Sequence, residues 1–273
     1  MSEHANISSR DLWRLVDGTF GLMNSETHVH HQMVSTLAYH MAKAAGLSQT
    51  MQHLTLQAAY LHDLGGAIGG QDVNLQDIEA SAWHIAQVSA SLLEDFPKFT
   101  ALAAIIRHCQ SPYRRNKGLR LPSLKLPGLD KSVLPKDVLA LLPEKLQFPH
   151  LTNPLEPANL IPLADAVSLL IKPDVPVLNQ VPGILEEVRS APDEEFAPSA
   201  VAALEQLAGE EHIWLDLAYA PEHILDEVVE ERMVDVDQAM QVSRLVSTVI
   251  DFRSPFTAMH SAGVAASARA LAR

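Results

Sequence analysis

The sequence predicts an all-α protein built as a helical bundle, and three observations lead to this fold class. Apolar residues recur at spacings of three and four through most of the chain, which is the period of a helix with one buried face. Ala, Leu, Met and Gln dominate these segments, and alternating runs of β-branched residues are scarce. Several of the apolar runs are followed by glycine or proline, where a helix would end.

The expected helices follow one another along the chain, each marked by its own apolar stripe. The stripes are formed by Val34, Leu37, Met41 and Ala45; by Leu54, Ala58 and Leu61; by Ile85, Val88 and Leu92; by Leu102, Ile105 and Ile106; and by Leu163, Val167 and Leu170. Gly46 is expected to end the first helix, Gly65 and Gly66 the second, and Pro97 the third.

Composition sets limits on the class of protein. The 273 residues are enough for one large domain, or for one domain with an appendage. The 33 acidic and 20 basic residues give a net charge of -13, which argues against non-specific binding to nucleic acid. The single cysteine, Cys109, excludes an internal disulfide and fits a reducing compartment. No apolar run approaches the roughly 20 residues of a membrane span, so we expect a soluble, cytoplasmic protein.

Residues 110–157 interrupt the helical pattern with a long proline-rich segment. Its first part carries the basic residues Arg114, Arg115, Lys117 and Arg120, which form a dense basic cluster in an acidic chain. One interpretation is a solvated loop. The other is a flap whose basic residues meet an anionic, phosphorylated substrate.

Six titratable residues fall on apolar helical stripes, where an unpaired polar group is costly. They are His30, His62, Asp63, His84, His108 and Asp165. His62 and Asp63 stand at the end of the stretch AAYLHDLGG, where an apolar run meets two glycines. Convergence on one or two divalent cations such as Fe or Mn would satisfy all six together, because carboxylates and neutral imidazoles suit these ions.

Each of these residues has a structural alternative when it is taken alone. A buried histidine can donate to a carbonyl, Asp165 can pair with an arginine, and Asp63 can cap the glycine turn. Cys109 is expected to be a small buried apolar residue, with a soft metal ligand as the alternative. Five other histidines are expected to be exposed or satisfied in the core: His28, His31, His40, His53 and His212.

The order His30, then His62-Asp63, then Asp165 resembles the motif of the HD-domain superfamily of metal-dependent phosphohydrolases. His84 and His108 resemble the extra histidines of the HD-GYP branch, which hold a second metal and are associated with cyclic di-GMP phosphodiesterases. The resemblance implies hydrolysis of a phosphoester, in a phosphorylated small molecule or a nucleotide, by metal-activated water. Asp63 would orient that water, and Arg114, Arg115 and Lys117 would contact the substrate.

The sequence departs from the HD-GYP pattern at three places. Leu64-Gly65-Gly66 follows His62-Asp63 without the usual lysine, His108-Cys109-Gln110 replaces paired histidines followed by glutamate, and the Gly-Tyr-Pro motif is absent. These departures leave a second hypothesis open, in which the module is catalytically degenerate and regulates or dimerises a downstream phosphodiesterase. A third hypothesis is a di-iron site that activates dioxygen, as in some HD-type proteins.

A short repeat underlies the expected domain organisation. Thr27-x-x-His30 and Thr257-x-x-His260 are each followed by Val four residues after the histidine and by Ala eight residues after it. Residues 209–219 and 249–272 resemble the connection between tandem HD modules and the start of the second. The expected domains are therefore residues 1–235 and 236–273, with His260 as the first ligand of the second module. An apolar face around Val264 and Leu271 would favour a homodimer.

Overall fold

The computed structural model describes residues 4–23, 25–66, 82–110, 155–191, 195–221, 224, 228–229, 231–253, 263–264 and 266–271. The basic residues Arg114, Arg115, Lys117 and Arg120, and His260 of the repeat, lie outside the described residues.

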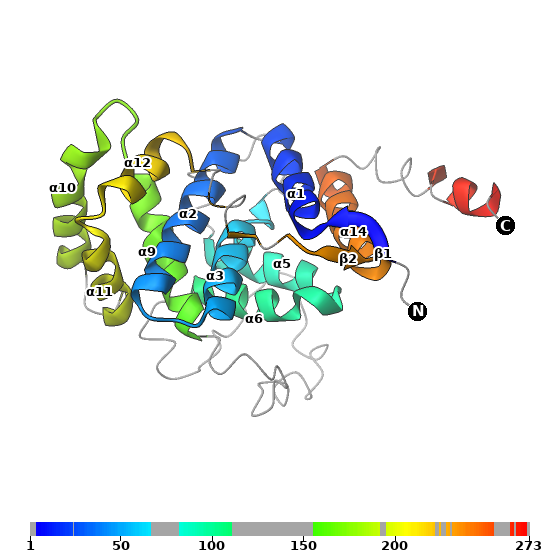
Figure 1. Cartoon of the computed structure of the whole chain (residues 1–273), viewed down its shortest axis with the longest axis horizontal. Helices are drawn as coiled ribbons and strands as arrows, with labels where there is room; N and C mark the ends of the chain where they lie inside the picture. The colour runs from blue at the N-terminus through cyan, green and yellow to red at the C-terminus, as the bar shows by residue number, and fades with distance from the viewer. Residues whose placement is uncertain are drawn as a thin grey trace.

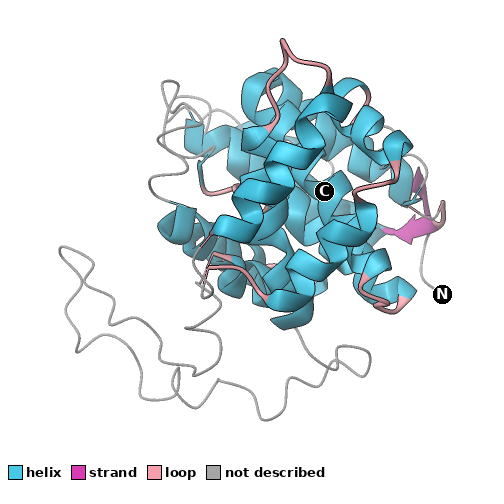
Figure 2. Cartoon of the chain, turned by 90° about the vertical axis from the view of Figure 1, so that its left-hand side faces the viewer, coloured by secondary structure: helices cyan, strands magenta, loops and turns pink. Residues whose placement is uncertain are grey.

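The described chain is almost entirely helical, which confirms the predicted all-α class (Figures 1 and 2). Its elements are β1 (His4–Ser8), α1 (Ser9–Met23), α2 (Ser25–Ala44), α3 (Gln49–Leu61), α5 (Ala82–Glu94), the short 3-10 helix η2 (Pro97–Phe99), α6 (Thr100–Cys109), α9 (Leu155–Leu170), α10 (Val177–Ser190), α11 (Pro198–Leu207), α12 (Glu211–Tyr219), β2 (Met233–Asp235) and α14 (Val236–Arg253). Within this part of the chain, no helix is both long and apolar enough to cross a membrane.

Helix α2 is the centre of the bundle. It packs against α3 and α9 and also meets α1, α11 and α12. In Figure 1, α10, α11 and α12 cover one end of the bundle, and α1, α14 and the two strands cover the other. Ten residues of α2 are buried, and they include polar side chains as well as apolar ones. A central helix with polar residues on its buried faces is the natural place for a site.

The predicted helix ends agree with the structure. Helix α2 stops where Gly46 adopts a positive φ of 72°, and the Leu47 N–H donates to the Ala42 carbonyl, as in a Schellman motif. Ser48 then starts α3, with its side chain accepting from the Met51 N–H. Helix α3 ends at Leu61, just before His62-Asp63 and the glycines. The local sequence therefore fixes where the His-Asp pair leaves the helix.

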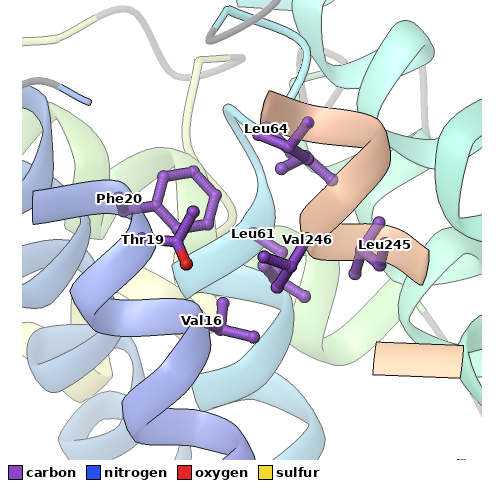
Figure 3. Close-up of a pocket in the computed structure, with 8 residues that line it drawn as sticks. Val16, Thr19, Phe20, Leu61, Leu64, Leu245 and Val246 are labelled. Atoms are coloured by element: carbon purple, nitrogen blue, oxygen red, sulfur yellow. The ribbon is translucent and has the colours of Figure 1, made fainter. Parts of the chain in front are cut away.

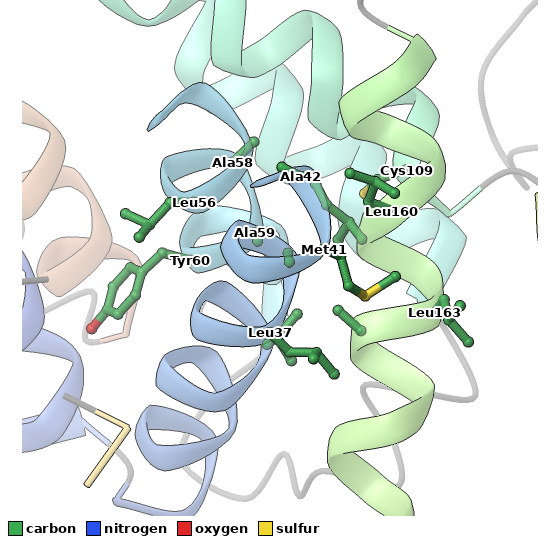
Figure 4. Close-up of a cluster of buried hydrophobic side chains, with 14 of the residues drawn as sticks. Leu37, Met41, Ala42, Leu56, Ala58, Ala59, Tyr60, Cys109, Leu160 and Leu163 are labelled. Carbon is green, nitrogen blue, oxygen red and sulfur yellow. The ribbon is translucent and has the colours of Figure 1, made fainter. Parts of the chain in front are cut away.

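The core between α2, α3 and α9 consists of tightly packed aliphatic side chains (Figure 4). Leu37 and Met41 of α2 and Leu163 of α9 are fully buried, and Leu160 of α9 is nearly so. Small residues, including Ala58 and Ala59, let α3 approach its neighbours closely. This packing sets the three helices in the positions from which the polar residues described below converge.

Two features of the fold were not expected from the sequence. Strand β1 pairs antiparallel with β2, joining two segments that lie over 200 residues apart, with His4 opposite Asp235 and Ser8 opposite Met233. Helix α12, within the segment interpreted as an inter-module connection, buries Trp214 completely and packs on α2. Such long-range pairings leave no periodic signal in a short segment.

Helix α14 lies beyond the expected boundary at residue 235, and it packs on α1. Its residues Leu245 and Val249 are buried in the main core, and Figure 3 shows Leu245 and Val246 next to Val16 of α1 and Leu61 of α3. The helical residues 263–264 and 266–271 are exposed. The division into residues 1–235 and 236–273 and the homodimer stay predictions.

Candidate metal centre

The ends of helices position the first two site residues. His62 and Asp63 follow the last residue of α3, where backbone carbonyls lack helical partners. His62 uses one of them, because its Nδ1–H donates to the Ala59 carbonyl at 2.6 Å. A carbonyl can only accept, so this bond places the proton on Nδ1 and leaves the Nε2 lone pair of His62 free.

A second histidine, His30 of α2, is oriented in the same way. The Ser168 hydroxyl of α9 donates to the Asp165 carbonyl at 2.7 Å and lies 3.0 Å from Nδ1 of His30. Since the hydroxyl proton is committed to the carbonyl, Ser168 accepts from His30 Nδ1–H. Nε2 of His30 is therefore also left with a free lone pair, directed at the same centre as that of His62.

Asp165 of α9 supplies a carboxylate opposite these imidazoles. Gln110, just after α6, donates from Nε2 to Asp165 Oδ2 at 2.8 Å. That bond fixes one carboxylate oxygen and leaves Oδ1 directed toward Nε2 of His30, at 3.2 Å. Gln110 thus restricts the orientation of Asp165 without adding charge.

Four side chains from three helical segments therefore meet at one point. Asp63 Oδ2 lies 3.1 Å from His62 Nε2 and 3.7 Å from His30 Nε2, and Asp165 Oδ2 lies 3.7 Å from His62 Nε2. The ligand atoms of His30, His62 and Asp63 all lie within 4.8 Å of one another. The side chains are 4%, 0% and 4% exposed, and Asp165, at 14%, is the most open of the four.

Each of these four side chains has one buried polar atom without a hydrogen-bond partner in the described part of the chain. These atoms are Nε2 of His30, Nε2 of His62, Oδ1 of Asp63 and Oδ1 of Asp165. Each unsatisfied buried polar atom costs about 1–3 kcal/mol. Four such atoms on side chains that converge on one centre indicate a site built for a ligand rather than a hydrogen-bonded core cluster.

The electrostatics of the cluster favour positive charge at its centre: protons on Nε2 of the imidazoles when no cation is bound, or a cation that would displace these protons and take the lone pairs. Burial opposes the imidazolium form of His30, but the carboxylates of Asp165 and Asp63 raise its pKa to about 9. Burial likewise opposes charging of His62, yet Asp63 and Asp165 raise its pKa well above the ordinary value. The two imidazoles in turn hold the pKa values of Asp63 and Asp165 well below the usual range, although burial would raise them.

A divalent cation fits this donor set. Two ligand atoms that each lie about 2.1 Å from one ion are roughly 3.0–3.4 Å apart at tetrahedral or octahedral angles. The Asp63–His62 and Asp165–His30 separations of 3.1 and 3.2 Å fall within that range. Nitrogen and oxygen donors suit Fe, Mn or Zn, and the two carboxylates balance a charge of +2.

His84 and His108, which were expected to extend the site, are not among the described residues whose ligand atoms converge. His84 is exposed on the first turn of α5. His108 is half-buried in the last turn of α6, where burial, followed by the nearby Arg107, lowers its pKa. Neither joins the described group of converging ligand atoms. A second metal held by His84 and His108 stays a prediction.

Cys109 lies in the core, as the main interpretation expected (Figure 4). Burial raises the pKa of its thiol, and the charges of Asp63 and Asp165 raise it further. A protonated thiol is a poor metal ligand, because the thiolate is the form that binds. The environment therefore disfavours Cys109 as a soft ligand.

Sequence reasoning missed two residues that orient side chains of the site. Ser168 and Gln110 orient His30 and Asp165, as described above. His31 was expected to be exposed or satisfied in the core, but it is 2% exposed and neither ring nitrogen has a hydrogen-bond partner among the described residues. Its ring lies 5.9 Å from the rings of both His30 and His62. The available signal was a polar residue, Ser168, one turn after Asp165 in an apolar helix. The pairing of Gln110 with Asp165 carried no local signal.

Gly65 has a packing role beside the site. Its N–H donates to Ser89 Oγ at 2.8 Å, and a Cβ at this position would lie 2.6 Å from the Ile85 carbonyl of α5. The absent side chain therefore lets the turn after Asp63 lie directly on α5. The remainder of the glycine run, residues 67–70, lies outside the described residues.

Comparison with protein families places these residues in a known pattern. The family model of the HD domain matches residues 27–168, which is just over half of the chain and includes all four converging side chains. Comparison with curated proteins and with solved structures gives no match.

Proposed function

Because this chain belongs to the HD domain family of metal-dependent phosphohydrolases, we propose that it hydrolyses a phosphoester at the centre formed by His30, His62, Asp63 and Asp165. The observation that carries the proposal is that the four side chains that converge on this centre each keep a buried polar atom without a hydrogen-bond partner among the described residues. A divalent cation bound there supplies a Lewis acid for a phosphoryl oxygen and lowers the pKa of a nearby water.

Hydrogen bonds from neighbouring residues fix the orientation of the side chains at the centre. The Ala59 carbonyl and Ser168 hold His62 and His30 in the tautomer that presents Nε2. Gln110 holds Asp165 through Oδ2. None of these contacts has to form during the reaction, so the ligand set is preorganised.

Asp63 is the proposed catalytic residue. Its Oδ2 contacts both imidazoles, whereas Oδ1 has no partner within the described residues. Oδ1 can accept a hydrogen bond from an attacking water and so orient it, while Oδ2 keeps the carboxylate in place. His62 and His30 hold the pKa of Asp63 below its usual range although burial would raise it, so the carboxylate stays ionised near neutral pH and can hold a cation and orient water.

The substrate class follows from the family and from the charge pattern of the sequence. We expect a phosphorylated small molecule or a nucleotide, including a cyclic dinucleotide, with Arg114, Arg115 and Lys117 contacting its phosphate oxygens. Asp165 is the most exposed of the four ligands, and we expect substrate to approach from its side.

A regulatory module is the second candidate, and one observation favours it. Gln110, rather than a further acidic or imidazole ligand, contacts Asp165, and the Cys109 thiol beside it is buried with a raised pKa. This neighbourhood supports one metal better than two. A module with one retained cation and no turnover would act by binding alone.

Turnover separates the two candidates. The full chain, loaded with Mn²⁺ or Fe²⁺, is assayed against bis(p-nitrophenyl) phosphate, p-nitrophenyl phosphate and cyclic di-GMP. We expect hydrolysis that requires the metal and falls to background in Asp63→Ala with helicity retained. Asp17→Asn is the matched control, because it alters a different, partly buried aspartate that hydrogen-bonds to His28, and it should keep activity. Stoichiometric metal without turnover of any substrate would overturn the hydrolase proposal in favour of the regulatory one.

A further inference from the structure

Two adjoining cavities form a cleft between α1, α3 and the residues around β2. They share five lining residues, Ser9, Trp13, Leu54, Gln57 and Arg232. Their volumes are about 140 and 290 Å³, which together suit a small organic molecule. None of the four residues of the metal centre lines either cavity. The cleft is therefore separate from the centre described above.

One part of the cleft is apolar. Val16, Leu61, Leu102 and Leu245 line the first cavity together with the indole of Trp13. The Trp13 ring meets Tyr60 edge-on, with 6.1 Å between centroids and 82° between planes, which fixes the orientation of the indole. This wall offers a flat apolar surface to a ligand.

The other part of the cleft is polar and basic. Arg232 lines both cavities, Lys98 the first and His53 the second, and no carboxylate is among their described lining residues. That lining stands out in a chain of net charge -13. The cleft therefore presents positive charge beside an apolar wall.

The charged groups around the cleft are arranged so that Arg232 stays available. Glu231 pairs with Arg10 at 3.2 Å, and Asp235 lies 3.9 Å from Lys98. The backbone of Arg232 is held by Ser9, since the Ser9 N–H donates to the Arg232 carbonyl at 2.8 Å. Its guanidinium is exposed and has no ion pair with any described residue.

We propose that this cleft binds a small organic anion, with its apolar body on Trp13 and its acidic group at the Arg232 guanidinium. Charge-assisted hydrogen bonds from guanidinium to an anion are among the stronger polar contacts in proteins. The aromatic ring provides contact area with little loss of side-chain freedom. The cleft is independent of phosphoester hydrolysis, so its ligand need not be the substrate.

The test is calorimetric titration of the full chain with 1-naphthalenesulfonate, which combines an aromatic body and a fixed negative charge. We expect saturable binding to one site and weaker binding of neutral 1-naphthalenemethanol. Arg232→Gln should weaken the sulfonate about tenfold or more, because it removes a charge-assisted hydrogen bond. Leu54→Trp, which fills the shared part of the cleft, should also weaken it.

Arg189→Gln is the matched control, since Arg189 is an exposed arginine that pairs with Glu205 on a different part of the surface. It should bind the sulfonate as the wild type does. Circular dichroism confirms the fold of each variant, and Arg232 is exposed enough to be replaced without loss of the core. Absence of saturable binding, or equal affinity of the wild type and Arg232→Gln, would overturn the proposal.

Discussion

Two clusters of histidine and aspartate form around helix α2, with His28 in the first and His30 in the second. They differ in how their polar atoms are hydrogen-bonded. In the first, Asp17 Oδ1 accepts from Tyr60 at 2.5 Å, contacts His28 Nε2 at 2.8 Å and accepts from Gln32 at 3.0 Å. In the second, Nε2 of His30 and Oδ1 of Asp63 find no hydrogen-bond partner within the described residues. His28 and His30 are only two residues apart.

The difference shows how to tell a structural cluster from a ligand site. The Asp17 cluster closes on itself, so its polar groups stabilise the packing of α1 on α2 and α3. In the second cluster, the Ala59 carbonyl, Ser168 and Gln110 orient His62, His30 and Asp165, while Nε2 of both imidazoles has no hydrogen-bond partner among the described residues. Residue type alone does not separate the two clusters, whereas hydrogen-bond accounting does.

The largest expected effect comes from replacing one histidine of each cluster. His30→Ala should weaken Mn²⁺ binding by more than about 100-fold, because loss of an outer partner alone costs about 10–100-fold. His28→Ala should leave the affinity unchanged. Calorimetric titration of both variants measures this. If the two variants lost Mn²⁺ affinity equally, the two clusters would act as one unit and the distinction between them would be wrong.

The second-largest expected effect is the loss of thermal stability when the metal is removed. Metal at about 100 times its Kd stabilises a protein by about 2.7 kcal/mol, so a chelator should lower the Tm by roughly 5–10 °C. Asp63→Ala should show no such shift, and Asp17→Asn should show the full shift relative to its own starting Tm. Scanning calorimetry with and without EDTA provides the measurement. A shift in Asp63→Ala as large as in the wild type would place the metal elsewhere.

Asp17→Ala should lower the free energy of unfolding by about 2 kcal/mol while metal affinity is retained. The substitution leaves the buried Tyr60 hydroxyl without its acceptor and removes the contacts with His28 and Gln32. Urea unfolding of the metal-free proteins is the measurement. A loss below about 0.5 kcal/mol, the range of ordinary surface substitutions, would show that the closed cluster is not stabilising.

The smallest effect concerns pH. Burial would raise the pKa of Asp17, but hydrogen bonds from His28, Tyr60 and Gln32 hold it below its ordinary value of 3.8. The stabilisation from the ionised carboxylate is therefore present above the unfolded-state pKa and lost as pH falls through the lower folded-state pKa. The stability difference between wild type and Asp17→Asn should shrink as pH falls below about 5. A difference that grows on acidification would contradict the assignment.

Local sequence patterns predicted much of the fold and four of the residues that converge on the candidate metal centre. The periods of three and four gave the helices, and Gly46 and the glycines after Asp63 marked where α2 and α3 end. The order of His30, His62-Asp63 and Asp165 was enough to indicate an HD site, and the family match includes all four. The predicted second metal, substrate contacts and second module remain predictions.

The sequence by itself determined the helical class, the helix ends and the residue types able to hold a cation, because these depend on spacing within a few turns. Tertiary structure decided which buried histidines turn a free nitrogen to a shared centre and which, like His28, are satisfied at Asp17. It also decided that Ser168 orients His30 across 138 residues of sequence and that Gln110 orients Asp165 across 55. Such contacts depend on how helices pack, and packing brings together side chains whose separation along the chain carries no period.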